Sequence, residues 1–468
     1  MNMEPDRTQA PPAGPAPHVH LGGHHSFTMK NGMCVIVVED RKIPIVSLQV
    51  RFDHAPVPQG DKVGFLELMG ELLTSGTDGK TKVEIDEEVD SIGAKLMGST
   101  DGLYASCLTR NFPQLFKLIG EVVTTSNFPE AEFAKAKTRL VSQIGARADD
   151  PDQIAEVVGH ALTFGKQHPY GEVASEATVD RMERRDLLNY YQRFFQPASG
   201  YLVLVGDINE EEGMAMAEAT FGSWTGHEQA PANGEEAQMS AAPVLLSEKR
   251  VAFVDRPGSG QSVIKVVFPL ELKPNDPMAL HAQVLNTILG GGVFNARLMQ
   301  NLREDKGYTY GAYSSIESDR WAGNFSAGCS VRNEVTEDAV SQIMMEVTRI
   351  RDEPVKADEL ALAKSYMAGS FARSLEDPRT VARFALNTFL YGLPAEHYET
   401  YLQRLEAVDI AGIQAAAQRF LHPAQATMLV VSDKAEVMGT LTGLVSSGRV
   451  QEFDINGDPV NRDAIKGA

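Results

Sequence analysis

The apolar and polar positions near the start of the chain predict a small β-sheet followed by a helix. Two short apolar runs flank Asn31-Gly32, the strongest short-range signal for a β-hairpin. Residues 45–52 alternate between apolar and polar side chains and predict a third strand. After Gly64 the apolar positions follow a helical period, and this helix is expected to end at Gly76.

The same alternation of helical and strand patterns continues to about residue 221 and predicts an α+β fold. The predicted helices cover residues 83–93, 113–126, 130–148, 183–195 and 210–221, and the predicted strands lie within 95–109 and at 201–207.

The second half of the chain repeats the first. Asp150-Pro151 and Asp377-Pro378, which each begin a predicted helix, are 227 residues apart, and so are Glu132–Lys137 and Glu359–Lys364. Two apolar strand patterns that end at Asp207 and Asp433 are 226 residues apart. Matches in the same order at a nearly constant offset indicate a duplicated unit.

The repeat and the local composition define five segments. Residues 1–25 are rich in Pro, Ala and Gly and are expected to form a disordered leader. Residues 226–246 are expected to link a first half at 26–225 to a second half at 247–455, because Gly226–Pro243 is polar and rich in Pro, Gly and Ala. Residues 456–468 form a tail.

The charge of the chain narrows the partners that it can have. The net charge is −20 and the pI is near 5.0, which argues against nucleic acid and against anionic membrane surfaces, since both attract basic proteins. The three cysteines are too few and too scattered for a disulfide framework and are expected to be free thiols. The leader has no apolar signal-peptide core, so the sequence as given favours the cytoplasm; a periplasmic location stays open if a signal peptide was removed.

A Gly-rich stretch from Leu289 to Tyr313 carries the chain's clearest binding chemistry. If the helix in this stretch stops at Gly307, a guanidinium from Arg303 and a phenol from Tyr310 are presented together. Arg supplies a rigid fork of donors and Tyr one hydroxyl, which suits the gripping of a peptide carbonyl or of the oxyanion that it becomes. The alternative is an ordinary surface Arg beside a strand Tyr.

Arg303, Tyr310, the Gly-rich turn and the Asn295–Leu298 segment together resemble the second-half signature of the pitrilysin/insulinase (inverzincin) zinc peptidases. The resemblance covers residues from about Ser26 to Phe453. It implies two tandem homologous α+β halves, each an α/β-sandwich unit, that face one another like a clam shell. It also implies that Arg303 and Tyr310 hold the substrate over a zinc ion bound by a first half.

The zinc motif of that family is degenerate in this chain. The resemblance places an HxxEH motif on the helix after Gly64, where two imidazoles bind zinc and a Glu activates water. The three positions hold Glu67, Gly70 and Glu71, and the position of the third ligand, a Glu near the end of helix 130–148, holds Gln143. We therefore expect no zinc or other cofactor in this chain, with zinc in a partner subunit. Two solvated glutamates are favoured over a hard-cation site, because Ca²⁺ needs six or more oxygen ligands.

The resemblance thus implies a catalytically incomplete subunit of a heteromeric zinc metallopeptidase that acts on peptides or unfolded proteins. Its partner would be an HxxEH-bearing homologous subunit, in a heterodimer or a larger assembly. The alternative is a non-proteolytic peptide-binding or assembly subunit. A third hypothesis is a self-sufficient peptidase with unusual ligands.

Overall fold

The computed structural model describes residues 24–227, 246–292 and 294–460 and contains two six-stranded mixed sheets. Most of the predicted leader, linker and tail therefore lie outside the described residues. The first sheet has the order β1-β2-β6-β3-β5-β4, and the second has the order β12-β7-β11-β8-β10-β9. This confirms the predicted α+β class with two similar halves.

The strands of the first sheet are β1 (His24–Thr28), β2 (Cys34–Glu39), β3 (Ile45–Phe52), β4 (Lys95–Ser99), β5 (Gly102–Leu108) and β6 (Gly200–Gly206). Those of the second are β7 (Arg250–Asp255), β8 (Gln261–Leu270), β9 (Ala312–Ser318), β10 (Gly323–Arg332), β11 (Thr427–Ser432) and β12 (Val450–Phe453). The predicted hairpin is present, since Thr28 pairs with Cys34 across a turn in which Gly32 has φ 93°.

The helices of the first half are α1 (Phe65–Leu72), α2 (Lys82–Ser91), α3 (Phe112–Thr125), α4 (Glu130–Arg147), α5 (Pro151–Phe164), α6 (Glu176–Asp180), α7 (Arg184–Phe194) and α8 (Glu210–Phe221). The predicted helix after Gly64 is too long, because α1 stops at Leu72. The Ser75 amide bonds back to the Leu72 carbonyl at 3.0 Å, and Gly76 then bridges to Thr81, which leads the chain out of the helix.

The helices of the second half are α9 (Ala279–Asn286), α10 (Arg297–Met299), α11 (Thr336–Asp352), α12 (Ala357–Ser374), α13 (Pro378–Leu390), α14 (Tyr401–Ala407), α15 (Ile410–Phe420) and α16 (Lys434–Leu441). Two π-helical segments, η4 (Thr287–Gly291) and η5 (Gln300–Asp305), continue α9 and α10. Among the described residues, no helix is both long and apolar enough to cross a lipid bilayer.

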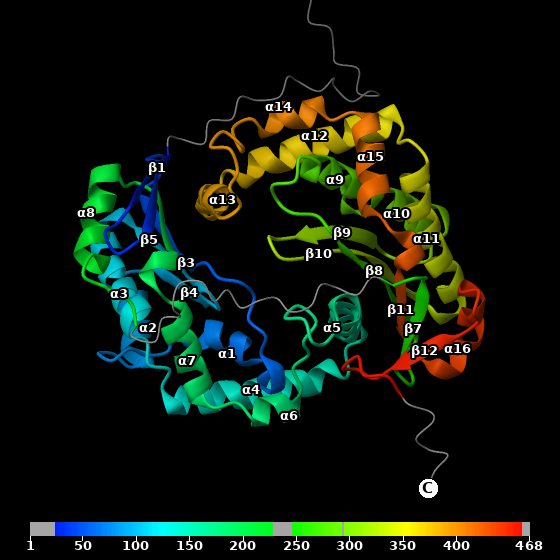
Figure 1. Cartoon of the computed structure of the whole chain (residues 1–468), viewed down its shortest axis with the longest axis horizontal. Coiled ribbons are helices and arrows are strands. Elements are labelled where there is room, and N and C mark those ends of the chain that lie inside the picture. The colour runs from blue at the N-terminus through cyan, green and yellow to red at the C-terminus, as the bar shows by residue number, and fades with distance from the viewer. Residues whose placement is uncertain (1–23, 228–245, 293, 461–468) are drawn as a thin grey trace, which may run out of the picture.

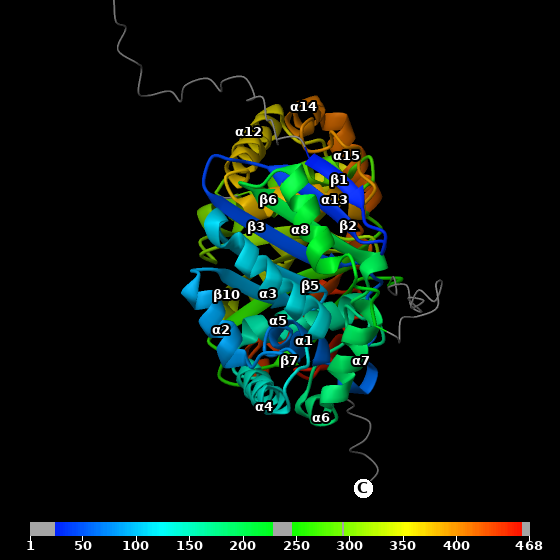
Figure 2. The same cartoon turned by 90° about the vertical axis from the view of Figure 1, so that its left-hand side faces the viewer.

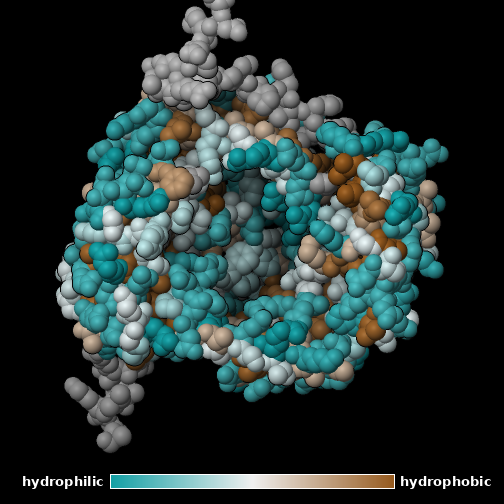
Figure 3. Space-filling model, turned by 180° about the vertical axis from the view of Figure 1, so that it is seen from behind, coloured by the Kyte–Doolittle hydropathy of each residue, from teal (hydrophilic) through white to brown (hydrophobic). Residues whose placement is uncertain are grey.

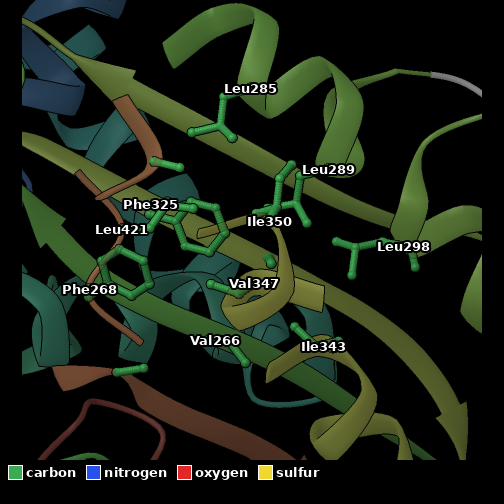
Figure 4. Packing of buried hydrophobic residues seen from close by; sticks show 14 of the residues in the cluster. Val266, Phe268, Leu285, Leu289, Leu298, Phe325, Ile343, Val347, Ile350 and Leu421 are labelled. Carbon is green, nitrogen blue, oxygen red and sulfur yellow. The ribbon is translucent and has the colours of Figure 1, made fainter. Parts of the chain in front are cut away.

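Both sheets are apolar on both faces, so each needs a covering layer on each side. In the first sheet, Val35, Val37 and Leu204 point into a large core with α3 and α8, which Figure 2 shows on the outside of this half. In the second sheet, Val266, Phe268 and Phe325 pack against Leu285, Leu289, Ile343, Val347 and Ile350 (Figure 4). The rings of Phe268 and Phe325 are stacked with their centroids 4.6 Å apart.

The remaining face of each sheet is covered by a helix from the other half. Ile154 and Val158 of α5, in the first half, pack on Val263, Leu429 and Val431 of the second sheet. In the reciprocal cluster, α13 of the second half packs on the first sheet. Ala382, Leu386 and Leu390 contact Ile36, Val38, Val203 and Val205. Figure 1 shows α5 beside the strands of the second half and α13 beside those of the first. The two helices begin at the repeated Asp-Pro pairs, so the exchange follows the internal repeat.

Polar contacts reinforce this exchange and close the molecule into a ring. Arg256 pairs with Asp149 at 2.6 Å, and Arg147 donates to the Asn456 side chain at 2.9 Å. On the opposite side of the hollow, Arg320 at the tip of the β9–β10 hairpin pairs with Asp53 after β3. The halves enclose a central hollow that is lined mainly by hydrophilic residues in the view of Figure 3.

Candidate functional site

The first candidate region is the helix α1, where the resemblance places the zinc motif. Gly64 begins this helix in a left-handed conformation with φ 109°, and α1 then packs along α4 and against the edge strand β4. Leu66 is fixed by a 3.0 Å hydrogen bond that its carbonyl accepts from the Thr100 hydroxyl. Glu67, Gly70 and Glu71 therefore have a defined position between α4 and β4.

Two arginines of α4 interact with the two glutamates at the positions where the resemblance places zinc-binding histidines. Glu71 forms an ion pair with Arg139. Glu67 keeps some exposed surface, but partial burial of its carboxyl group raises the pKa of Glu67. The positive charge of Arg147 acts in the opposite direction and lowers this pKa. Arg147 itself is buried and donates to the Ala174 carbonyl at 3.0 Å.

Gly70, at the position where the resemblance places the general base, makes a close backbone contact. A Cβ atom at this position would lie 3.1 Å from the backbone of Ser99 and Thr100. The glycine opposite it, Gly98, has a reciprocal constraint, because its Cβ would lie 2.3 Å from the Gly70 carbonyl oxygen. A carboxylate side chain at position 70 would thus require β4 to move away from α1.

These residues do not fit a zinc ion. Zinc sites in proteins use imidazole or thiolate donors, usually with at most one or two carboxylates, in a tetrahedral set. Here Glu71 is engaged by Arg139, Gln143 is exposed and offers only a neutral amide oxygen, and Gly70 offers no side-chain donor. Within the described residues, no group of three or more His, Cys, Asp or Glu side chains could hold a metal ion.

Arg139 and Arg147 are the residues at this site that the sequence analysis missed. They lie four residues before and four residues after Gln143 and therefore share a face of α4 with it. This spacing was the signal in the sequence. An arginine four residues before and another four residues after Gln143 could have predicted electrostatic interactions with Glu67 and Glu71 of α1.

The second candidate region lies around Gly307, which ends the helix as predicted. Gly307 has φ 62°, its amide bonds to the Arg303 carbonyl at 3.1 Å, and the Tyr308 amide bonds to Leu302 at 2.9 Å. The turn is then held from α11, because Lys306 and the Tyr308 hydroxyl each donate to Asp338 at 2.8 Å. Tyr310 lies in the segment between this turn and the start of β9.

Arg303 and Tyr310 are both available at the surface. The Tyr310 side chain is 95% exposed, and in the part of the chain that the structure describes its hydroxyl has no hydrogen-bond partner. The Arg303 guanidinium lies over the ring of Phe294, 5.0 Å from its centroid, and 3.4 Å from the Glu304 carboxylate. Among the described residues, no hydrogen bond, ion pair or ring contact joins Arg303 to Tyr310 directly.

The chain is similar to known zinc proteases along most of its length. A family model described as the peptidase M16 inactive domain matches residues 181–367. An uncharacterized zinc protease of Mycobacterium leprae is 24% identical over 368 residues, which cover 77% of this chain and 80% of that protein.

Two solved structures share the fold. The peptidase M16 inactive domain from Pseudomonas fluorescens matches with a TM-score of 0.78 at 22% identity, over 88% of this chain and 98% of that chain. A protease from Helicobacter pylori also matches with a TM-score of 0.78, at 17% identity, over 88% of this chain and 99% of that chain.

These similarities define the class of protein. They confirm the resemblance of this chain to the pitrilysin/insulinase-type, or M16, peptidases. The findings support a catalytically incomplete peptidase of this type, because the family model that matches describes the inactive domain.

Proposed function

We propose that this chain is the zinc-free subunit of a heteromeric zinc peptidase and that it supplies Arg303 and Tyr310 to the active site of a zinc-binding partner. The observation that carries this proposal is the exposure of Tyr310. The turn that precedes Tyr310 is held by Asp338, so the phenol, whose hydroxyl has no hydrogen-bond partner among the described residues, is available to a partner or a substrate.

The chemistry of the pair fits this role. In a closed site with little water, a guanidinium and a phenol stabilise the negative charge that develops on the substrate carbonyl oxygen during hydrolysis. Neither group has to activate water or bind metal, so the partner supplies the zinc and the base. In this chain the corresponding positions are used instead for the contacts between α1 and α4.

An alternative function, peptide binding without cleavage, is favoured by the same exposed pair and the hydrophilic hollow, if no zinc-binding partner exists. The two proposals differ in what accompanies the protein and in whether mixing creates activity.

The decisive experiment is co-purification followed by reconstitution. The tagged chain is isolated from its own cells, and an HxxEH-bearing homologue is expected to accompany it. Neither protein alone should cleave a quenched fluorescent peptide, whereas their mixture should. If the zinc-binding homologue is fully active alone and does not associate with this chain, the proposal is wrong.

A further inference from the structure

A groove that could hold a ligand lies beside Arg303, outside the positions of the zinc motif. The groove has a volume of about 660 Å³ and lies between η4, α10, α11 and α12. Phe294 lines it and also carries the Arg303 guanidinium on its ring. The groove therefore adjoins Arg303 through Phe294.

The rim of the groove carries four exposed apolar side chains among exposed polar ones such as Asn295, Gln300 and Lys356. Phe294 is 56% exposed, Leu362 47%, Met345 43% and Tyr366 39%, and all four line the groove. Leu362 and Tyr366 are one turn apart on α12 and present the same helix face. Scattered exposed apolar residues need no explanation, but four large ones around one concavity are typical of a binding site.

Beneath this rim, buried charged groups keep unused hydrogen-bonding capacity. Arg297 is 6% exposed and forms a two-point ion pair with Glu359, at 2.8 and 2.9 Å, which leaves its Nη1 without a partner in the part of the chain that the structure describes. Glu346 is 3% exposed and accepts from Asn301 at 3.0 Å and from Arg349 at 3.2 Å. Within residues 24–227, 246–292 and 294–460, its Oε2 and the Oδ1 of Asn301 have no hydrogen-bond partner.

The combination of these groups selects the class of ligand. The floor has one unpaired donor and two unpaired acceptors, and each residue of a peptide backbone carries one N–H donor and one C=O acceptor. The unpaired atoms have almost no exposed surface, so a backbone satisfies them through a bridging water or a small shift of the lining. The rim would receive an apolar side chain.

We propose that this groove binds a peptide segment through an apolar side chain held by Phe294, Leu362 and Tyr366, with its backbone over Arg297 and Glu346. The proposal rests on the proposed function in taking a peptide as the ligand, and it adds a second point of contact outside the Arg303–Tyr310 pair. In a complex, the groove would favour substrates with an apolar residue at a fixed distance from the bond that is cleaved.

The test uses the full chain and a fluorescein-labelled peptide of Ser and Gly with a single central Phe, and the same peptide with Ala in place of the Phe. Anisotropy titration should show saturable binding of the Phe peptide and at least about tenfold weaker binding of the Ala peptide. Leu362→Asp and Tyr366→Ala should each weaken binding of the Phe peptide by a similar factor. Glu346→Gln keeps the shape of the floor and should weaken both peptides alike.

Val83→Asp is the matched control, because Val83 is 64% exposed on α2, outside the groove, and its replacement should leave binding unchanged. The proposal is overturned if the wild-type chain shows no saturable binding, or if the Leu362→Asp and Val83→Asp variants bind equally. If Leu362→Asp instead abolishes co-purification with the HxxEH-bearing homologue while peptide binding persists, the groove is a subunit interface.

This design separates the groove from the proposed function. Tyr310→Phe, at a residue outside the groove lining, should lower activity of the reconstituted complex by about 10²–10³-fold but leave anisotropy binding of the Phe peptide largely intact. Failure of the groove proposal would leave the co-purification result standing, and failure of co-purification would leave the anisotropy result standing.

Discussion

Arg139 of α4 forms an ion pair with Glu71 of α1, and it does so one helical turn before Gln143 on the same helix. Where a zinc site would draw the two helices together through a metal, these helices are joined by opposite charges. Arg147, one turn after Gln143, acts on Glu67 in the same sense.

The ion pairs predict how the isolated chain behaves with zinc. Purified protein, analysed for metal by mass spectrometry, should contain far less than stoichiometric zinc. Gln143→Glu should not change this, because both imidazoles are missing and the new carboxylate would lie between two arginines that already have partners. Stoichiometric zinc in either protein would contradict this account of the site.

Replacement of Arg303 or Tyr310 should disable a reconstituted complex without unfolding this subunit. Loss of one oxyanion donor is expected to lower kcat by about 10²–10³-fold. Tyr310→Phe removes only a hydroxyl, so the effect can be assigned to one hydrogen bond. Arg303→Lys keeps the charge but not the fork and should recover only part of the activity.

The control for these variants is thermal unfolding, which should be nearly unchanged because Tyr310 is exposed and has no hydrogen-bond partner among the described residues. Full activity of a complex in which both residues are replaced would exclude the role in trans.

Cleavage between the halves should not separate them. The Pro/Gly/Ala-rich segment at Gly226–Pro243 is the expected first site of limited proteolysis. Ile154 and Val158 are buried on the second sheet, and Leu386 on the first, each contributing about 1.5–3 kcal/mol. The two fragments seen on a denaturing gel should therefore elute together in native gel filtration. Their separate elution would show that the exchanged helices do not hold the halves together.

The Arg297–Glu359 ion pair should be sensitive to removal of one partner. Glu359→Gln leaves a guanidinium that is 6% exposed without its counter-charge, and urea unfolding should show a loss of about 3–5 kcal/mol. Removing Asp86 from the exposed Lys82–Asp86 pair should cost about 0.5 kcal/mol or less. Equal losses at the two sites would show that the buried ion pair contributes no more to the free energy of unfolding than the exposed one.

Acid should destabilise the protein through His397. Burial, with a smaller contribution from Arg404, lowers the pKa of His397 to about 4. In the unfolded chain the pKa of His397 is near 6.5, so the unfolded state binds a proton that the folded state does not. The free energy of unfolding therefore falls as the pH drops from about 6.5 to about 4.

Between pH 7 and pH 5 the loss from this one group is at most about 2 kcal/mol, and less because the side chain keeps part of its solvent contact. Urea unfolding of wild type and His397→Gln at the two pH values checks this. The variant should lose less stability on acidification than the wild type, and an equal loss in both proteins would be the contrary result.

Local patterns predicted the elements well and their assembly less well. Asn31-Gly32, Gly307 and the Asp150-Pro151 pair each act through their own backbone conformation, so the hairpin, the helix end and the start of α5 were visible in the sequence. The apolar face of α5 gave no sign that it packs on the other half, because Ile154 and Val158 would fit any apolar sheet face.

The candidate site shows the same division. The positions Glu67, Gly70, Glu71 and Gln143 could be identified from the motif. Their pairing with Arg139 and Arg147, and the contact of Gly70 with β4, depend on how α1 meets α4 and β4 in space. The groove next to Phe294 could not be foreseen, since it brings residues of 287–305 together with residues of α11 and α12.

The exchange of α5 and α13 also has a consequence for how the protein is made. As the chain leaves the ribosome, all six strands of the first sheet are present once Gly206 has emerged. The face that carries Ile36 and Val203 nevertheless stays open until Leu386 follows. Domains commonly fold in order during synthesis, but here neither half can close before almost the whole chain is available. A nascent chain stalled at the end of its first half would expose an apolar sheet face, and it would be a natural client for a chaperone.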